Sequence, residues 1–455
     1  MPSEVTVMKF GGTSVEDGPA FERVAHIVGA HEGGRPVVVA SAMSRVTDAL
    51  LSSLRTAARG EITEALRSVE EHLERHLQVG RGLGATARAG VTRRIESFGR
   101  EIADLLGGVA SSRRASAGLR DAVASYGERL SAYLLASVLA EHGLPASHVD
   151  ARRCIVTDGE HGSAGPLPAQ TRQRTRAELG HLLKAGRIPV LGGFIAATSR
   201  GVPTTLGRGS SDYTATLVAA ALDAREAQIW TDVSGVLTAD PRLIETARTV
   251  PRLSYGEAAQ LARFGAKVLH PKSLQPAARR GIPLRIFNSR APGEAGTLIC
   301  AGAEASGGAV KAITHQAGVH MIEVTSTPAA VANGFRRAVQ EIFGRRHTAV
   351  NLVATSEVGV SLACAGADAL PSVVQDLRRV GSVEVRGGRA LVCCVGAGLR
   401  GAPGAVWKLF DALAEIDPTL TRHSTAGNNC IFVVAEDRVG GVVRRLHRGI
   451  FEAGR

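Results

Sequence analysis

The stretch E-V-T-V-M-K-F-G-G-T-S, residues 4–14, decides how this chain begins to fold. Its first seven residues alternate in polarity and end in a Gly-Gly turn, which predicts a β-strand. The next strand-like stretch, P-V-V-V-A at 36–40, is a continuous apolar run typical of a strand buried in a parallel sheet. Residues 21–30, between the two, have the spacing of a helix. The chain therefore opens with a predicted β-α-β unit.

Strand-like and helical stretches continue to alternate up to about residue 300. Residues 48–145 are mainly helical in pattern, and apolar runs at 188–192, 227–230 and 284–287 each adjoin a helical pattern such as 213–222. Such alternation predicts an α/β domain with a mostly parallel open sheet and helices on both faces.

The pattern changes after the small, Gly-rich segment A-G-A-E-A-S-G-G-A at 301–309, which indicates a linker. Beyond it, short strand candidates, among them 320–325, 383–385 and 390–395, alternate with helical patterns in two β-α-β-β-α-β sets. This order predicts two small α+β modules. The predicted division is therefore a catalytic domain at 1–300, a linker at 301–309 and a C-terminal tandem of small modules at 310–455.

The composition narrows the class of protein. No apolar run approaches the roughly 18 residues of a membrane span, and the first residues do not resemble a secretory signal, so we expect a cytoplasmic protein with no membrane partner. The six cysteines lack C-x-x-C spacing, which predicts reduced thiols and no metal site. The formal charge of +12 is spread along the chain and aromatic residues make up only 4%, so we expect no nucleic acid partner.

Lys9 stands directly before the glycine turn at Gly11 and Gly12. A glycine turn between a strand and a helix exposes backbone N–H groups that bind phosphate oxygens, and an adjacent ammonium adds a point charge. The stretch K-F-G-G-T-S therefore indicates a phosphate site. An ordinary strand-to-helix turn with a surface lysine would have the same sequence.

A second polar cluster, L-G-R-G-S-S-D at 206–212, leads into the helical pattern at 213–222. Its glycines and hydroxyls, the guanidinium of Arg208 and the carboxylate of Asp212 would meet at a helix N-terminus, where the helix dipole favours an anion. Asp212 could also serve only as a helix cap. A cap alone does not explain the Gly-Arg-Gly sequence, which favours a binding site.

Three further motifs are weaker. The loops 230–242 and 264–271 follow a strand or a helix, where open α/β sheets bind ligands, although D-P-R and H-P are also common in turns. The stretch G-A-G-L-R-G at 396–401 matches G-x-G-x-x-G but lacks the surrounding β-α-β unit of a dinucleotide site. No G-x-x-x-x-G-K-[ST] motif is present, which excludes a P-loop kinase.

Taken together and in this order, these segments resemble the aspartate kinases (aspartokinases) of the amino acid kinase superfamily. The resemblance spans essentially the whole chain and rests on K-F-G-G-T-S (9–14), S-x-x-x-x-V-T-D (41–48), S-Y-G-E-R-L-S (125–131), G-F-I (193–195), T-T-L-G-R-G-x-S-D-Y-T-A (204–215), W-T-D-V-x-G-V (230–236), D-P-R (240–242) and F-G-A-K-V-L-H-P (264–271). The stretches T-S-E-V (355–358) and A-G-N-N-C-I-F-V (426–433) resemble the paired ACT domains of the monofunctional, lysine-sensitive type. The resemblance implies an amino acid kinase fold, two ferredoxin-like ACT domains and a homodimer formed through them.

Aspartate kinases transfer the γ-phosphoryl group of ATP to the side-chain carboxylate of L-aspartate, the first step of aspartate-family amino acid biosynthesis. The residues suit this chemistry, because a carboxylate is already ionised at pH 7 and the reaction needs cations and N–H groups rather than a general base. The resemblance implies that Lys9 and Lys267 stabilise the phosphates and that Asp212 orients both lysines. It implies Mg²⁺ on the ATP phosphates, with no protein side chain expected as a ligand.

The same resemblance implies two binding sites. The aspartate site would comprise Thr47, Glu128, Phe194, Arg208 and Ser211, with Glu128 on the α-amino group and Arg208 on a carboxylate. The nucleotide site would comprise Lys9, Gly11, Gly12, Thr231, Asp232, Arg242 and Lys267.

Two residues in these sites depart from the family pattern. Ser210 replaces a glycine of the usual G-R-G-G-S-D, a change that costs about 1 kcal/mol if the residue has a positive φ. We expect activity to be retained. Leu237 stands where many members have tyrosine, which leaves the nucleotide preference open.

A third departure concerns the effector site. Where members of this type commonly place an aspartate on the effector's amino group, this chain has Asn351, with Ala329 and Ala332 near the helix start and Arg336 where an aliphatic residue is usual. An amide cannot make the charge-assisted hydrogen bond of a carboxylate to an ammonium. We therefore expect weak or absent lysine inhibition, or a different amino acid effector.

Two alternatives remain open from the sequence. One is a kinase for another amino acid, such as glutamate or an N-acylated amino acid; Glu128 argues against an acylated substrate, which has no free ammonium. The other is a catalytically inactive regulatory subunit that binds amino acids through its ACT domains. The set Lys9, Arg208, Asp212 and Lys267 argues against that alternative.

Overall fold

The computed structural model describes most of the chain: residues 4–31, 34–207, 209–266, 269–303, 308–326, 334–346, 350–355, 359–365, 370–399, 403–414, 420–423 and 428–452. Contacts divide it into two compact units, Met1–Val236 with Leu269–Ala301, and Leu237–Val268 with Gly302–Arg455. The predicted boundaries differ from these units at 237–268, which packs within the second unit. The difference arises because docking depends on partners far away in the chain, which local sequence patterns do not reveal. The linker at 301–309 stays a prediction, because residues 304–307 lie outside the described residues.

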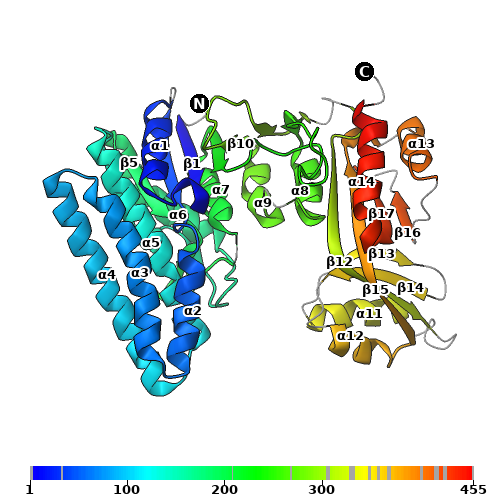
Figure 1. Cartoon of the computed structure of the whole chain (residues 1–455), viewed down its shortest axis with the longest axis horizontal. Helices are drawn as coiled ribbons and strands as arrows, with labels where there is room; N and C mark the ends of the chain where they lie inside the picture. Colours follow the sequence, from blue (N-terminus) through cyan, green and yellow to red (C-terminus); the bar gives the residue numbers. More distant parts are fainter. Residues whose placement is uncertain are drawn as a thin grey trace. The chain divides into compact units, whose positions relative to one another are not determined.

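The first unit is built on a twisted sheet whose strands, apart from the last, run parallel (Figure 1). In chain order its strands are β1 (Val5–Phe10), β2 (Arg35–Ala40), β3 (Ala146–Val149), β5 (Ile188–Gly192), β8 (Glu226–Thr231), β10 (Leu284–Asn288) and β11 (Thr297–Ile299). Their spatial order is β3-β5-β2-β1-β8-β10-β11, and β11 pairs antiparallel with β10. All six residues of β1 are buried, as expected for a central strand covered on both faces.

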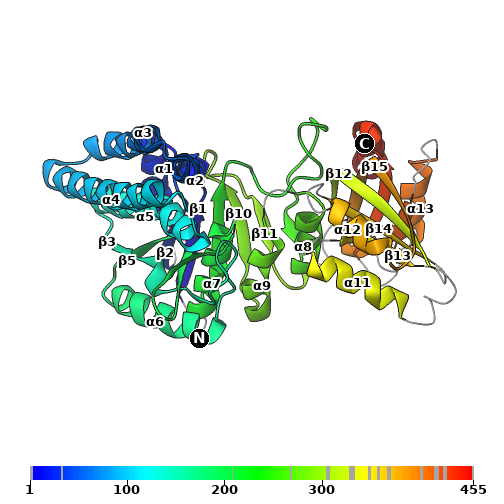
Figure 2. The ribbon, with the colours of Figure 1, turned by 90° about the horizontal axis from the view of Figure 1, so that it is seen from below.

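Helices cover both faces of this sheet, as Figure 2 shows. One face carries α1 (Gly18–Gly29), α2 (Val46–Ala58), α3 (Ile62–Arg81), α4 (Ala85–Ser112) and α5 (Ala117–Glu141), and the other carries α6 (Pro168–Lys184), α7 (Ser211–Leu222) and α9 (Pro271–Arg280). Short elements complete the unit: η1 (Gly12–Ser14), η2 (Ala151–Arg153) and a small sheet of β4 (Val156–Thr157), β6 (Ile195–Thr198) and β7 (Pro203–Thr205). None of the helices in the described part of the chain is long and apolar enough to span a membrane.

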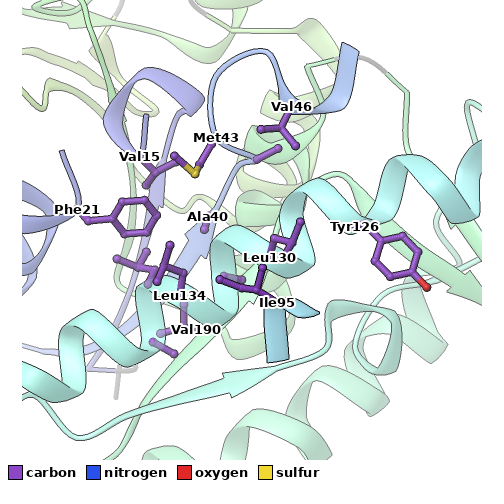
Figure 3. Close-up of a cluster of buried hydrophobic side chains, with 14 of the residues drawn as sticks. Val15, Phe21, Ala40, Met43, Val46, Ile95, Tyr126, Leu130, Leu134 and Val190 are labelled. Carbon is purple, nitrogen blue, oxygen red and sulfur yellow. The ribbon is translucent and has the colours of Figure 1, made fainter. Parts of the chain in front are cut away.

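The core of the first unit joins the sheet to its helices. Phe21 of α1, Leu134 of α5 and Val190 of β5 belong to one buried cluster, drawn in Figure 3, and each such side chain contributes about 1.5–3 kcal/mol when fully buried. At one end of the sheet, the ring of Trp230 stacks on Phe10 and on Phe287, with centroid distances of 6.0 and 4.7 Å. These aromatic contacts hold the carboxyl ends of β1, β8 and β10 together.

The second unit contains one antiparallel sheet in the order β13-β14-β12-β15-β17-β16. Its strands are β12 (Ala312–Thr325), β13 (Val350–Thr355), β14 (Gly359–Ala365), β15 (Ser382–Val395), β16 (Leu420–His423) and β17 (Asn429–Ala435). Its helical elements are α8 (Tyr255–Arg263), α11 (Phe335–Arg345), α12 (Leu370–Leu377), η4 (Ala397–Leu399), α13 (Pro403–Asp411), η5 (Glu436–Arg438), α14 (Val439–His447) and η6 (Arg448–Glu452), and the short strand β9 (Arg252–Leu253) precedes α8.

Two separate cores lie along this single sheet. Ile322, Val339 and Leu362 belong to a core with α11 and α12, whereas Phe432 and Leu446 belong to a core with α13 and α14. This supports the expected pair of α+β modules. The predicted short strands 320–325, 383–385 and 390–395 were too short, because β12 and β15 each run for 14 residues through both modules. All six cysteines are free thiols, as predicted.

Candidate active site

The carboxyl ends of the central parallel strands form one edge where five chain segments meet. Backbone hydrogen bonds extend the sheet past the strand ends: Gly11 N donates to Trp230 O (3.0 Å), Ser41 N to Phe10 O (3.0 Å), Gly193 N to Ala40 O (2.8 Å) and Ser289 N to Thr231 O (2.8 Å). Ligands in open α/β sheets bind at this edge. Most of the site residues expected from the sequence and described in the structure lie here.

Lys9 and Asp212 form a nearly buried ion pair at this edge. Lys9 lies near the end of β1 and Asp212 in the first turn of α7, with Lys9 Nζ 2.7 Å from Asp212 Oδ1 and side chains 10% and 12% exposed. A Cβ atom on Gly11 would lie 3.5 Å from the same Nζ, so the glycine turn runs directly beside the ammonium. Asp212 therefore does more than cap its helix: it joins α7 to the lysine of the predicted phosphate site.

Glu128 is a fully buried carboxyl with an unsatisfied oxygen. It lies on α5, is 4% exposed, and its Oε2 has no hydrogen-bond partner among the described residues. Burial raises the pKa of Glu128 to about 8, although hydrogen bonds with the backbone of Ala42 and of Glu128 itself act in the opposite direction. An ammonium placed against Oε2 would satisfy the oxygen and favour the charged carboxylate. This geometry suits the predicted contact with a substrate amino group.

Thr47 lies at the start of α2, close to α5. A Cβ atom on Gly127 of α5 would lie 2.9 Å from Ala42 Cβ and 3.3 Å from Thr47 Oγ1, so only glycine lets the two helices approach this closely. Because Gly127 precedes Glu128, this contact brings Thr47 and Glu128 to the same part of the edge.

Phe194 and Ser211 meet where β5 ends and α7 begins. Phe194 has a positive φ of 61°, and its N–H donates to Thr214 Oγ1 at 2.9 Å. A Cβ atom on Gly193 would lie only 2.5 Å from Ser211 Cβ. The turn is therefore pressed against α7, and a buried hydroxyl holds Phe194 in a conformation that non-glycine residues seldom adopt. The role of Thr214 was not predicted, although the residue lies inside the T-T-L-G-R-G-x-S-D-Y-T-A stretch.

The loop before α7 lines a cavity of about 340 Å³, bounded among others by Gly207, Ser210, His270 and Lys272. Ser210 has a φ of −90°, so this serine bears no positive-φ strain, and its hydroxyl donates to the carbonyl of Gly207. Burial, and then the charge of Lys272, lower the pKa of His270. Arg208 falls in this loop but lies outside the described residues.

A network of hydrogen bonds to a buried carboxylate holds the segment that leads into this loop. This network was not predicted from the sequence. Asp121 of α5 accepts hydrogen bonds from Thr205 Oγ1 (2.6 Å) and Gly162 N (3.0 Å), and its Oδ2 lies 2.8 Å from His161 Nδ1. Thr205 ends β7, three residues before Arg208. No sequence motif indicated this network, because its members come from three separate segments.

The predicted nucleotide residues are only partly brought together. Gly11, Gly12, Thr231 and Asp232 lie in the first unit, and Thr231 Oγ1 donates to Asp232 Oδ1 at 3.2 Å. Arg242 belongs to the second unit, where its exposed guanidinium pairs with Asp240 at 2.6 Å. Lys267 lies outside the described residues.

The expected effector residues are described only in part. Arg336 lies on α11 and is exposed, and Asn351 lies on β13, where the structure describes its backbone but not its side chain. Ala329 and Ala332 lie outside the described residues.

The G-x-G-x-x-G match at 396–401 is occupied by protein contacts. Ala397 N donates to Glu257 Oε1 at 2.8 Å, Gly396 N donates to Asn428 O at 2.8 Å, and a Cβ atom on Gly398 would lie 2.5 Å from Ala309 Cα. The backbone N–H groups of Gly396 and Ala397 are thus already paired, which agrees with the expectation that this motif does not bind a dinucleotide.

Comparisons with known proteins agree with the site geometry. The model of the amino acid kinase family matches residues 4–288. The lysine-sensitive aspartokinase 3 of Escherichia coli (strain K12) is 33% identical, over 99% of this chain and 100% of that protein. The crystal structure of E. coli aspartokinase III with aspartate and ADP (R-state) has a TM-score of 0.87 and 32% identity, covering 98% of this chain and 100% of that one.

A second crystal structure of the E. coli enzyme, with lysine and aspartate (T-state), has a TM-score of 0.81 and 33% identity, covering 99% of this chain and 100% of that one. The relative and both structures extend over the whole length of the chain, and the family model covers its N-terminal part. The expected resemblance and the expected fold class, with C-terminal regulatory ACT domains, are confirmed. This chain belongs to the amino acid kinase family and, within it, to the aspartokinases.

Proposed function

We propose that this chain transfers the γ-phosphoryl group of ATP to the side-chain carboxylate of L-aspartate. A carboxylate oxygen forms a bond to the γ-phosphorus, the bond from that phosphorus to the β,γ-bridging oxygen breaks, and ADP leaves with the electron pair. The aspartokinase relatives and the E. coli structure that holds aspartate and ADP support this reaction. The observation in this chain that carries the proposal is the Lys9–Asp212 ion pair at the carboxyl end of β1.

Lys9 is the group that would stabilise the transferring phosphoryl group. The nucleophile and the phosphate are both anionic, so the barrier is lowered by cations fixed in place before the reaction. Asp212 holds the ammonium of Lys9 at a defined position beside the glycine turn. We propose Lys267 as the second phosphate-binding ammonium, with Gly11 and Gly12 supplying N–H groups and Thr231, Asp232 and Arg242 lying along the nucleotide.

Glu128 would select a free amino acid. Its unsatisfied Oε2 is suited to an ammonium, and Thr47, Phe194 and Ser211 approach the same edge of the sheet. We propose that Arg208 binds a carboxylate of aspartate through its two-pronged guanidinium. An N-acylated amino acid has no ammonium for Glu128, so this site disfavours that class of substrate.

Mg²⁺ would accompany the nucleotide. Among the described residues, no group of three or more His, Cys, Asp or Glu side chains could hold a metal ion. This sparse donor set fits an ion held mainly by phosphate oxygens and water, and the ion would neutralise charge on the β- and γ-phosphates. The chain's own contribution is the lysine and the backbone N–H groups.

An ADP-release assay tests the proposed function. Purified full-length protein is supplied with ATP, Mg²⁺ and, in turn, aspartate, glutamate and N-acetylglutamate, and we expect turnover with aspartate. Faster turnover with either other compound would contradict the substrate assignment. Amino acid binding without turnover of any compound would instead support the inactive regulatory subunit.

We also propose that lysine inhibits this chain weakly or not at all, and that the ACT domains respond to another amino acid or to none. The E. coli structure with lysine shows that a relative binds this amino acid. The proposal rests on Asn351, an amide in place of the carboxylate usual for this type. Calorimetric titration with lysine and threonine, alongside the activity assay, tests it; micromolar lysine binding with inhibition would contradict it.

A homodimer is the assembly we propose, formed through the ACT domains. In the second unit, Trp407 and Phe410 lie one turn apart on α13 and are 73% and 38% exposed. Exposed aromatic side chains of this size are common at subunit interfaces. Light scattering on the purified protein should give twice the mass of the chain, and a monomer at micromolar concentration would contradict the proposal.

A further inference from the structure

A second cavity lies in the first unit, along the face of α7 that packs against α6 and α9. It has a volume of about 260 Å³, and its apolar lining includes Leu217, Ala220, Ala221 and Pro276. Taking roughly 30 Å³ for each water molecule, this space would hold about eight waters or one small organic molecule. Nothing in the proposed phosphotransfer uses this cavity.

The polar lining of this cavity is strongly cationic. Arg172 of α6 and Arg279 and Arg280 of α9 all line it. In the part of the chain that the structure describes, Asp223, at the end of α7, is the carboxylate paired with two of them: it lies 3.1 Å from Arg172 and 3.6 Å from Arg280. Two of the three guanidiniums that line the cavity, those of Arg172 and Arg280, therefore share one carboxylate, which leaves a net positive charge at its rim.

That single carboxylate is further engaged by a fourth arginine. Arg176 of α6 lies 2.5 Å from Asp223, and its Nε donates to Ala221 O at 2.6 Å, which satisfies a carbonyl at the end of α7. Arg176 and Asp223 thus form part of the frame that holds α6 to α7. Little of the negative charge of Asp223 remains to compensate the other arginines.

Arg279 has no carboxylate within 4.0 Å among the residues that the structure describes. The charge of Arg279 acts on Tyr213 at the cavity wall. Burial raises the pKa of Tyr213, and the nearby charge of Arg279 lowers this pKa by a smaller amount. Tyr213 also lines the cavity beside the loop that contains Arg208, so the two cavities are neighbours. Arg279 is therefore an exposed cation at the wall of an apolar cavity, with no counter-ion among the residues whose positions the structure gives.

We propose that this cavity is a binding site for a small organic oxyanion, a carboxylate or phosphate on a compact carbon body. The oxyanion would pair with Arg279 and Arg172, since guanidiniums bind carboxylate and phosphate through paired N–H donors. The carbon body would lie against Leu217, Ala220 and Pro276. A ligand with both parts would use the whole lining: a free inorganic ion leaves the apolar wall unused, and a neutral molecule leaves Arg279 without a counter-ion among the described residues.

This site is separate from the candidate active site, although one helix joins them. α7 carries Asp212 in its first turn and Ala221 in its last, about 14 Å apart at 1.5 Å per residue, and the cavity extends along the helix from Ala221 to Tyr213. A ligand in the cavity would contact the helix that positions Asp212 without contacting Asp212 itself.

Calorimetric titration of the full-length protein with phenyl phosphate and with phenylacetate tests the proposal. We expect saturable binding of one molecule per chain for at least one of the two, and the tighter probe identifies the preferred oxyanion. Inorganic phosphate and benzyl alcohol should each bind at least about tenfold more weakly, since each lacks one of the two features. Equal affinity for inorganic phosphate, or no saturable binding of either organic anion at millimolar concentration, would overturn the proposal.

Three variants test whether the probe binds in this cavity. Arg279→Gln should weaken binding at least about tenfold, the effect of losing one charge-assisted hydrogen bond. Ala220→Phe should abolish it by filling the cavity, with no change of charge. Arg93→Gln removes an exposed charge from α4, outside the cavity, and should leave the affinity unchanged.

Unchanged affinity in Arg279→Gln and Ala220→Phe, with both proteins still unfolding cooperatively, would show that the probe binds elsewhere and would overturn the assignment. Neither residue belongs to the proposed phosphotransfer site, so kinase turnover without the probe should match the wild type in both. The site and the proposed kinase activity can therefore fail independently.

Discussion

The ammonium of Lys9 lies 2.7 Å from Oδ1 of Asp212, although Lys9 lies near the end of the first strand of the chain and Asp212 in the first turn of a helix in the middle of the sequence. Both side chains are nearly buried, so water screens their attraction less than it would at the surface. The pair fixes a positive charge at the edge where the strands β1, β2, β5 and β8 end.

Lys9→Ala should lower kcat by about 100- to 1,000-fold, because it removes a fixed charge that acts on the transferring phosphoryl group. Asp212→Asn keeps the shape but not the charge, and should lower kcat by a smaller factor. Lys9→Arg should not restore the rate, since the flat guanidinium does not replace a compact ammonium. Steady-state ADP release measures all three, with Asp17→Asn, at the cap of α1, as a control of unchanged kcat. Near-wild-type turnover of Lys9→Ala would refute the assigned role.

Glu128 should make the stability of the ligand-free protein depend on pH. Its pKa is about 8 in the folded chain against 4.5 as the ordinary value. As pH rises from about 4.5 to 8, the unfolded carboxyl ionises while the buried one stays protonated, so the free energy of unfolding falls across this window. Glu128→Gln should remove that part of the fall. Thermal unfolding of the wild type and of Glu128→Gln at pH 5 and pH 8 measures this loss of stability. An equal loss of stability between the two pH values in both proteins would contradict the assigned environment of Glu128.

Aspartate binding should release a proton at pH 7. An ammonium against Oε2 favours the ionised carboxylate, so the Glu128 carboxyl gives up its proton to the solvent when the substrate binds. The released proton is taken up by the buffer. The heat of aspartate binding should therefore differ between phosphate and Tris buffers by close to the difference between the ionisation enthalpies of the two buffers. Heats that do not depend on the buffer would mean that substrate binding does not ionise Glu128.

Thr214→Val should raise the KM for aspartate more than it lowers kcat. The variant keeps the volume but leaves Phe194 N–H without its acceptor, and a buried unsatisfied donor costs about 1–3 kcal/mol. The strained turn at Phe194 should then relax away from the aspartate site. Thr216→Val is a matched control on the same helix, because among the described residues the Thr216 hydroxyl donates to Tyr213 O, within α7 itself. Equal effects of the two variants on the KM for aspartate would show that Thr214 has no specific role in the aspartate site.

Lys311→Met should destabilise the second unit by about 3–5 kcal/mol, because it leaves a buried carboxylate without its cation. Lys311 Nζ lies 2.9 Å from Glu257 Oε2 and 2.7 Å from Ala303 O, and Glu257 is fully buried. Adding Glu257→Gln should recover part of the loss, since the amide carries no charge. Chemical denaturation of the two variants measures this. A double variant no more stable than the single one would show that the pair contributes through shape and not through charge.

Asn351→Asp should strengthen lysine binding. A carboxylate would supply the charge-assisted hydrogen bond that the amide lacks, worth about 1.5–3 kcal/mol, or at least tenfold in affinity. Calorimetric titration with lysine compares the variant with the wild type, and inhibition of ADP release should strengthen in parallel. Tight lysine binding already present in the wild type would contradict the premise.

Much of the architecture could be predicted because its signals are local. The alternation at 4–10 and the apolar run at 36–40 correspond to β1 and β2, and the polar stretch 206–212 leads into α7, which begins at Ser211, two residues before the expected start. Motif order also indicated the family. The expected strands 320–325 and 390–395 were each too short, because a 14-residue strand shared by two modules changes its buried face along its length and has no uniform pattern.

Other features could not be predicted because they depend on partners far away in the chain. The docking of 237–268 in the second unit depends on contacts such as Glu257 with Lys311 and Ala397. The Asp121 network joins three segments that carry no common motif. The unsatisfied oxygen of Glu128 became visible only once α5 was packed, since burial and not residue type sets its pKa.

By itself, the sequence determined the α/β fold class, the family and the residue types from which a phosphotransfer site can be built, because strand and helix periods and glycine turns are properties of neighbouring residues. The tertiary structure alone decided which of those residues share an environment: Lys9 with Asp212, Phe194 with Thr214, and Arg279 with an apolar wall and no counter-ion among the described residues. Charge and burial act over a few ångströms in space, and that proximity is created by folding rather than by order along the chain.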